Sequence, residues 1–227
     1  MTIMRANSEN NANRPVDPDD SQSVYRHDAR PPCTSGYLVP IVLQACRAAG
    51  ARRVLDLGSG NGTLCRALAE AGFAVVGLEP SASGIEAARR AVPAGTFHRG
   101  SVYDGPEGIP ESDFDVVVST EVVEHLFRPA ALPALAFAKL KPGGRFVVST
   151  PYHGYLKNLL LALANCWDSH HAPGWDGGHV KFWYRRTLTT LLEAQGFRVL
   201  EFRGAGRFPW LWKSMVLVAE KASGSRA

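Results

Sequence analysis

The sequence predicts an α/β fold in which helices cover both faces of a doubly wound, mostly parallel sheet. Strand-like and helix-like patterns alternate along most of the chain, which is typical of parallel sheets. Residues 114–119 are rich in β-branched apolar side chains, as expected of a strand buried on both faces. Residues 54–57 form a second apolar strand that runs into a glycine-rich loop and then into a helical stretch.

The same patterns place the remaining elements. Apolar spacing and helix breakers predict helices at residues 38–49, 63–69, 84–91, 130–140 and 187–195. Ser81 can cap the third of these helices, and residues 141–144 (Lys-Pro-Gly-Gly) should end the fourth. Apolar runs predict strands at residues 54–57, 74–79, 96–99, 114–119, 145–150, 197–202 and 214–220. We expect the last two strands to form an antiparallel pair.

Length and composition predict one domain. The 227 residues are 45% hydrophobic and 20% charged, which suits a globular protein with a full core. Residues 1–22 are polar and predict a disordered tail, residues 23–221 a single domain, and residues 222–227 a flexible C-terminus. Four scattered cysteines without a C-x-x-C pair favour reduced thiols and a cytoplasmic location. We find neither a signal peptide nor an apolar run of about 18 residues.

The loop after the first strand predicts a ligand site. Residues 56–62 read Asp-Leu-Gly-Ser-Gly-Asn-Gly, and glycines allow a ligand to approach the backbone closely. In open α/β sheets, ligands bind at the carboxyl ends of strands. Glu79 closes the second strand, where an acid can accept both hydroxyls of a ribose. The nicotinamide fingerprint requires Gly-x-Gly-x-x-Gly, but the third glycine comes one residue early here. The alternative is a tight strand–helix turn without a ligand.

The glycine loop, Asp56 and Glu79 together resemble the first motif and the second-strand acid of class I S-adenosylmethionine methyltransferases. The Leu-Lys-Pro-Gly-Gly segment at residues 140–144 is a further likeness, and the match extends over residues 52–221. The resemblance implies a Rossmann-like sheet of seven strands in the order 3-2-1-4-5-7-6, with the last strand antiparallel, and S-adenosylmethionine as cofactor. The cofactor-binding residues that it implies are Asp56, Gly58, Ser59, Gly60, Gly62, Glu79, Pro80, Ser101, Val102, Asp104 and Thr120. Many relatives carry an acid where this chain has Ser101, so Asp104 is the substitute candidate for the adenine contact.

A second group of candidate residues follows the fourth strand. On a helix, Glu121, Glu124 and His125 would share one face, and such side chains are competent ligands for a divalent metal. Their spacing resembles that of ubiquinone-biosynthesis O-methyltransferases and of small-RNA 3′-end 2′-O-methyltransferases. The resemblance implies that these residues hold Mg²⁺ or another divalent cation, completed by His179. Alternatively, the glutamates are capping and surface charges and His125 a core residue, or His125 or His179 acts as a metal-free base.

Residues 151–186 form a long insertion that concentrates aromatic rings and imidazoles. Flat rings stack on flat substrates and exclude water, so we expect the insertion to act as a lid. Within it, an apolar helical face is predicted from Tyr155, Leu156, Leu159, Leu160, Leu163 and Trp167. That face could roof the site, contact a membrane that carries a lipid-tailed substrate, or pack as ordinary core.

These features predict an enzyme that transfers a methyl group to a hydroxyl of a small planar aromatic acceptor (a phenol, catechol or quinol). The alternatives are N-methylation of a planar heterocycle, 2′-O-methylation of RNA, and cofactor binding without catalysis. Residues 198–227 carry six cations and two acids, a surplus of 6 − 2 = +4 that more often marks a solvated face than a nucleic-acid site. A nucleic-acid partner is therefore not expected. The oligomeric state is left open.

Overall fold

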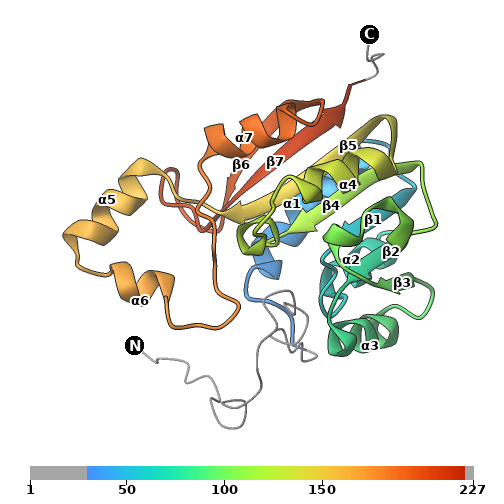
Figure 1. The fold of residues 1–227 in the computed structure, drawn as a ribbon, viewed down its shortest axis with the longest axis horizontal. Coiled ribbons are helices and arrows are strands. Elements are labelled where there is room, and N and C mark those ends of the chain that lie inside the picture. The colour runs from blue at the N-terminus through green and yellow to red at the C-terminus, as the bar shows by residue number, and fades with distance from the viewer. Residues whose placement is uncertain (1–29, 223–227) are drawn as a thin grey trace.

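A computed structural model describes residues 30–222, and these form a seven-stranded sheet covered by helices (Figure 1). The strand order β3-β2-β1-β4-β5-β7-β6 confirms the predicted topology. The pairs among β1 to β5 are parallel, whereas β7 runs antiparallel to both β5 and β6. The strands are β1 (Arg53–Leu57), β2 (Ala74–Glu79), β3 (Thr96–Arg99), β4 (Phe114–Thr120), β5 (Leu140–Pro151), β6 (Phe197–Ala205) and β7 (Ser214–Lys221).

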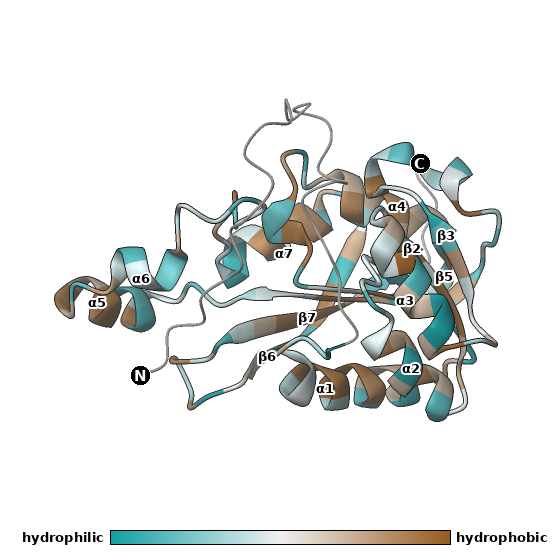
Figure 2. Cartoon of the chain, turned by 90° about the horizontal axis from the view of Figure 1, so that it is seen from below, coloured by the Kyte–Doolittle hydropathy of each residue, from teal (hydrophilic) through white to brown (hydrophobic). Residues whose placement is uncertain are grey.

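The helices form two layers, one on each face of the sheet. They are α1 (Ser35–Ala48), α2 (Thr63–Glu70), α3 (Ala82–Ala91), α4 (Ala131–Lys139), α5 (Tyr155–Leu163), α6 (Trp167–His171) and α7 (Arg185–Glu193), with short 3-10 helices at Val102–Asp104, Pro106–Gly108 and Val123–His125. Figure 2 shows α1 and α2 on one side of the sheet and α4 and α7 on the other. Helices α5 and α6 extend away from the sheet (Figure 1).

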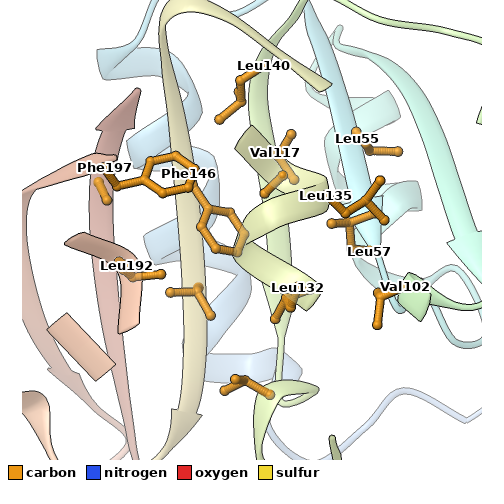
Figure 3. Close-up of a cluster of buried hydrophobic side chains, with 14 of the residues drawn as sticks. Leu55, Leu57, Val102, Val117, Leu132, Leu135, Leu140, Phe146, Leu192 and Phe197 are labelled. Atoms are coloured by element: carbon orange, nitrogen blue, oxygen red, sulfur yellow. The ribbon is translucent and has the colours of Figure 1, made fainter. Parts of the chain in front are cut away.

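Strand β4 contributes to the core on both faces. Val117 belongs to one buried cluster together with Leu135 of α4, and Figure 3 shows this cluster. Val116 and Val118 belong to the other cluster, which includes Val42 of α1. Because successive side chains of a strand point to opposite faces, both layers are anchored on the same central strand. The prediction of a strand buried on both faces is therefore confirmed.

Most boundaries agree with the prediction to within a few residues, and one strand differs more. Helix α4 ends at Lys139, before the Lys-Pro-Gly-Gly segment as expected. Strand β5 begins at Leu140 rather than at residue 145, since Leu140 already pairs with Phe114 before a shift in register. Helix α1 and strand β6 also start or end three residues beyond their predicted limits.

The expected helix that places Glu121, Glu124 and His125 on one face is wrong. Only Val123–His125 is helical, as a single 3-10 turn, and Glu121 has a left-handed φ of 55°. The Glu121 amide donates to Ser149 Oγ (3.2 Å) and its Oε1 accepts from the same hydroxyl (2.8 Å). These contacts hold Glu121 against β5, so the chain turns before it can begin a helix.

The lid helix forms, but it does not continue to Trp167. Helix α5 ends at Leu163, and Asn165 in the following turn has a φ of 50°. Trp167 begins the separate helix α6. Within residues 30–222 no helix combines the length and the apolar character needed to cross a bilayer. The predicted tail, residues 1–22, and the C-terminal residues 223–227 lie outside the described residues.

Candidate functional site

A cavity of about 480 Å³ lies where the carboxyl ends of β1, β2 and β4 meet, as expected for an open α/β sheet. Nine of the predicted cofactor residues line it: Asp56, Gly58, Ser59, Gly60, Glu79, Pro80, Ser101, Val102 and Thr120. Gly62 and Asp104 do not line it. We call Asp56, residues 58–60 and Glu79 the glycine-loop group, and Glu121, Glu124, His125 and His179 the histidine group.

The glycine loop folds tightly over the end of β2. The amides of Gly58 and Ser59 both donate to the Leu78 carbonyl, at 2.8 and 3.0 Å. Gly58 has a φ of 85°, and a Cβ there would come within 2.4 Å of Val122 Cγ2. The absence of a side chain therefore brings β1 and the segment after β4 together at the cavity.

Gly62 has a structural role that the sequence pattern did not predict. It has a φ of 78°, and a Cβ on it would lie 2.7 Å from the Ala88 Cα. Gly62 thus allows α2 to start directly against α3, with no cavity-lining role. Asn61 supplies the cap that glycine lacks, because its Oδ1 accepts from the Thr63 amide at 3.2 Å and from Thr63 Oγ1 at 2.7 Å.

Glu79 is buried at the end of β2, and both of its carboxylate oxygens accept backbone hydrogen bonds. Oε2 accepts from the Gly60 amide and Oε1 from the Ser81 amide, each at 2.9 Å. The side chain also lines the cavity. The backbone therefore fixes Glu79 in place at the position where a ribose diol is expected.

Asp56 is 1% exposed and lies deeper in the same wall. Its Oδ2 accepts from Cys65 Sγ at 3.3 Å, while Oδ1 has no hydrogen-bond partner in the described part of the chain. Burial raises the pKa of Asp56 to about 7, and Glu79 adds to the rise. A buried carboxylate oxygen without a partner suits a cationic ligand, which would restore the ionised form. The amino acid portion of S-adenosylmethionine carries such a cation, so the residues fit this cofactor.

The segment after β3 contributes Ser101 and Val102 to the cavity wall. Asp104 instead closes a capping box, in which its Oδ2 accepts from the Ser101 amide at 2.7 Å. This contact occupies Asp104 in holding the turn. Its assignment as an adenine contact stays a prediction, as do the other cofactor assignments.

The structure brings three of the four predicted metal ligands together. Ligand atoms of Glu124, His125 and His179 all lie within 4.8 Å of one another. Glu124 is 1% exposed, its Oε2 accepts from Thr150 Oγ1 at 3.0 Å, and its Oε1 has no hydrogen-bond partner among the described residues. An unpartnered carboxylate oxygen beside two imidazoles fits a divalent cation. Glu121 is not in this set, because its carboxylate accepts from Ser149 and from Ser214 Oγ (3.1 Å).

Burial shifts the pKa of every member of the histidine group toward the neutral form. The pKa of Glu121 rises to about 7, and that of Glu124 rises well above its usual value through burial and repulsion from Glu121. Burial lowers the pKa of His125, and lowers that of His179 to about 4 with the help of repulsion from His125. Neutral imidazoles are the form that binds metals and accepts protons.

Aromatic side chains complete the wall near His125. Phe127 and Trp175 line the cavity and are 68% and 55% exposed. The Trp175 ring lies edge-on to His125, with 6.4 Å between centroids. Sequence reasoning placed Trp175 in the lid but missed a group of wall residues that includes Pro32, Thr34, Ser35, Leu38, Val39, Thr63, Leu126 and Phe127. The α1 segment among them follows a Pro-Pro pair, which marks an irregular chain but gives no signal of a ligand.

Comparisons with known proteins agree with this geometry. A family model described as a methyltransferase domain matches residues 25–201. A ubiquinone biosynthesis O-methyltransferase from Methylobacterium nodulans is 32% identical over 189 residues, which cover 80% of this chain and 70% of the relative. One of that name from Bradyrhizobium sp. (strain ORS 278) is 42% identical over 114 residues, or 49% of this chain and only 44% of the relative.

Solved structures share the fold at lower identity. The magnesium protoporphyrin IX methyltransferase from Synechocystis PCC 6803, with bound SAH (demethylated S-adenosylmethionine), superposes with a TM-score of 0.62. It is 19% identical, and the match covers 82% of each chain. The glycine loop at the end of β1, the fixed acid at the end of β2 and the matched family model lead to one conclusion. The chain belongs to the methyltransferase-domain family of S-adenosylmethionine-dependent enzymes.

Proposed function

We propose that this protein transfers the methyl group of S-adenosylmethionine to a hydroxyl of a small planar aromatic acceptor, such as a phenol, catechol or quinol. The observation that carries the proposal is the position of His125, which lines the main cavity beside aromatic walls and lies next to Glu124 and His179. A flat acceptor can pack against Phe127 and Trp175 while it presents an oxygen to the histidine group. The names of the relatives support oxygen as the methylated atom.

In the absence of a metal ion, His125 can accept the proton that the acceptor hydroxyl must lose. Its Nδ1 lies 3.3 Å from the Gly178 carbonyl oxygen, and a carbonyl only accepts, so in the neutral ring Nδ1 carries the hydrogen. The lone pair is then on Nε2, which lies 3.9 Å from Glu124 Oε1. Because burial lowers the pKa of His125, the ring is neutral near pH 7 and ready to take up a proton.

We propose that in catalysis Glu124, His125 and His179 hold a divalent cation, in which case the Nε2 lone pair of His125 binds the ion and His125 is not the base. When bound, such an ion lowers the pKa of a coordinated hydroxyl. Glu121, which is absent from the set, instead ties β4, β5 and β7 together through Ser149 and Ser214. Extensive dialysis against EDTA should stop turnover, and Mg²⁺ should restore it. Turnover that persists in metal-free buffer would exclude the ion and leave His125 acting as a base alone.

The identity of the methylated atom is the sharpest test of the proposal. Full-length protein is incubated with methyl-¹³C S-adenosylmethionine and catechol, and NMR of the product locates the labelled methyl group. We expect an O-methyl product, and no product from the matched acceptor that lacks both hydroxyls. Methylation of a nitrogen heterocycle or of RNA, with phenols and catechols inert, would contradict the proposal.

The exposed helix α5 supports peripheral contact with a membrane. Its apolar side chains are exposed, Tyr155 at 71% and Leu163 at 75%. Figure 2 shows α5 coloured largely as hydrophobic. None of the α5 residues lines the main cavity, so α5 is not its roof. The exposed cations Arg207 and Lys213 line a cavity beside this helix and complement an anionic lipid surface. We propose such a surface as the partner of α5, and cosedimentation with anionic vesicles should fall in a Leu159→Ser, Leu163→Ser variant.

A further inference from the structure

A second cavity of about 230 Å³ lies between the insertion (residues 151–186) and the segment that joins β6 to β7, and it shares no lining residue with the main cavity. We call it the basic cavity. Helices α5 and α6 and the segment between β6 and β7 supply most of its wall, through Lys157, His170, His171, Arg207, Trp212 and Lys213, and His153 adds to it from the turn before α5. His179 also lines it, and the His179 ring lies 4.9 Å from that of His125. The two cavities are therefore neighbours across this pair of histidines.

The charged side chains that line the basic cavity are all cations. Lys157, Arg207 and Lys213 line it, and no carboxylate does so among residues 30–222. Burial lowers the pKa of Lys157 to about 8, repulsion from Arg207 adds to this shift, and Glu121 opposes it. A half-enclosed space lined by like charges is unfavourable unless an ion of opposite charge compensates them.

Lys157 has donors to spare for such an ion. It is 8% exposed, and its Nζ donates to the Tyr152 carbonyl at 2.8 Å. An ammonium group has three N–H donors, so this contact fixes its direction without exhausting it. Arg207, in contrast, is exposed at the rim, where its guanidinium can engage two oxygens at once.

The imidazoles add polar atoms without partners. His153 is 5% exposed, and in the part of the chain that the structure describes its Nε2 has no hydrogen-bond partner; the same holds for Nε2 of His171. The two rings stack at 5.5 Å between centroids. Buried ring nitrogens normally find a partner, so both indicate a ligand that the protein alone does not supply.

The arrangement fits an anion better than a metal. Among the described residues, the only group of three or more ligands gathered as for a metal is Glu124, His125 and His179, and it does not include His153, His170 or His171. A cation would also have to enter beside three positive side chains, at a cost in free energy.

We propose that the basic cavity binds an oxyanion of the phosphate class. Three cations match the charge of a phosphate or phosphate monoester, and Arg207 supplies the forked donor geometry that phosphates favour. The cavity is larger than a bare phosphate, so it also has room for part of the molecule that carries the group. That molecule is either a soluble phosphate or the headgroup of a phospholipid beneath α5.

Calorimetry with inorganic phosphate at constant ionic strength tests the site without any methyl transfer. We expect saturable binding of one phosphate per chain, weakened about tenfold in Arg207→Gln, which removes one charge-assisted contact at an exposed residue. Lys157→Gln should weaken binding at least as much. Arg90→Gln, an exposed charge on α3 outside the cavity, should have no effect. Absence of saturable binding, or equal binding by Arg207→Gln and the intact protein, would overturn the proposal.

A second arm identifies the carrier of the phosphate. Vesicles with anionic phospholipid are compared with neutral vesicles, each with and without inorganic phosphate. If inorganic phosphate at constant ionic strength releases the intact protein from the anionic vesicles, but does not release Arg207→Gln, the site is assigned to lipid headgroups. Phosphate binding in calorimetry without any effect on vesicle association assigns it to a soluble phosphate. Zn²⁺ binding that displaces phosphate and is unaffected by Arg207→Gln would contradict the oxyanion site.

Discussion

The glycine-loop group lines the main cavity and the histidine group contributes Glu121 and His125 to it, but the two groups are held in different ways. Glu79 accepts from two backbone amides, and those amides belong to the turns that follow β1 and β2. Glu121 is held by the hydroxyls of Ser149 and Ser214, which are 28 and 93 residues away in the chain. Local backbone geometry therefore positions the first group, whereas the assembled sheet positions the second. Mutations should accordingly be able to impair one group without the other.

The largest effect is expected from Glu124→Gln. The substitution removes the carboxylate of the Glu124, His125 and His179 set but keeps the size of the side chain and its contact with Thr150. We expect kcat to fall roughly hundredfold to ten-thousandfold, with cofactor affinity unchanged. Glu121→Gln is the matched control outside the ligand set and should lose much less activity. If both variants lose activity equally, Glu124 has no special role.

Asp56→Asn should instead weaken cofactor binding, which Glu124→Gln is expected to leave unchanged. It removes the buried charge that suits a cationic cofactor, so we expect calorimetry to show S-adenosylmethionine binding weakened about hundredfold. The melting temperature of the cofactor-free protein should not fall, because asparagine has no charge to bury. Unchanged affinity would contradict the placement of the cofactor at β1, whereas a loss of both affinity and folding would leave Asp56 a structural residue.

The pH dependence of the free energy of unfolding isolates the contribution of Asp56 from those of the other buried groups. Its pKa is raised from 3.8 to about 7 in the folded state, so the folded protein holds this proton more tightly than the unfolded chain. The associated stability is present below about pH 4 and is lost as the pH rises to about 7. The free energy of unfolding of Asp56→Asn minus that of the intact cofactor-free protein should therefore grow by about 2–4 kcal/mol across this range. A difference that is constant with pH would contradict the shift.

Local patterns predicted the glycine-loop group but not the arrangement of the histidine group. The apolar strand and the glycines are adjacent in the chain, and Glu79 ends the next strand, so their roles depend on local backbone conformation that residue type largely determines. The left-handed φ of Glu121 depends on Ser149 and Ser214, which no local pattern relates to it. Helical spacing therefore gave the correct neighbours Glu124 and His125 but the wrong position for Glu121.

The α1 residues of the cavity wall were missed for a similar reason. Arg30, just before α1, accepts through its carbonyl oxygen from Asn61 Nδ2 at 2.8 Å, which draws the start of α1 toward the glycine loop. This contact joins residues 31 positions apart, and neither residue type predicts it. The strand order, in contrast, was implied by the family resemblance, and the alternation of elements predicted the doubly wound sheet. Both depend on the whole pattern rather than on one contact.

The smallest expected effect is that of Gly62→Ala, which tests whether Gly62 has a structural role or binds the cofactor. Gly62→Ala places a Cβ against the Ala88 backbone at a residue with a φ of 78°, so we expect the free energy of unfolding to fall by about 2 kcal/mol. Gly36→Ala, at a helical position in α1 with nothing within 4 Å of the added Cβ, should instead raise it by about 0.5 kcal/mol. Denaturant titration measures both. Because Gly62 does not line the cavity, the cofactor affinity of its folded variant should match that of the intact protein. A large loss of affinity without a loss of stability would mean that Gly62 contacts the cofactor and that the third glycine belongs to the binding loop.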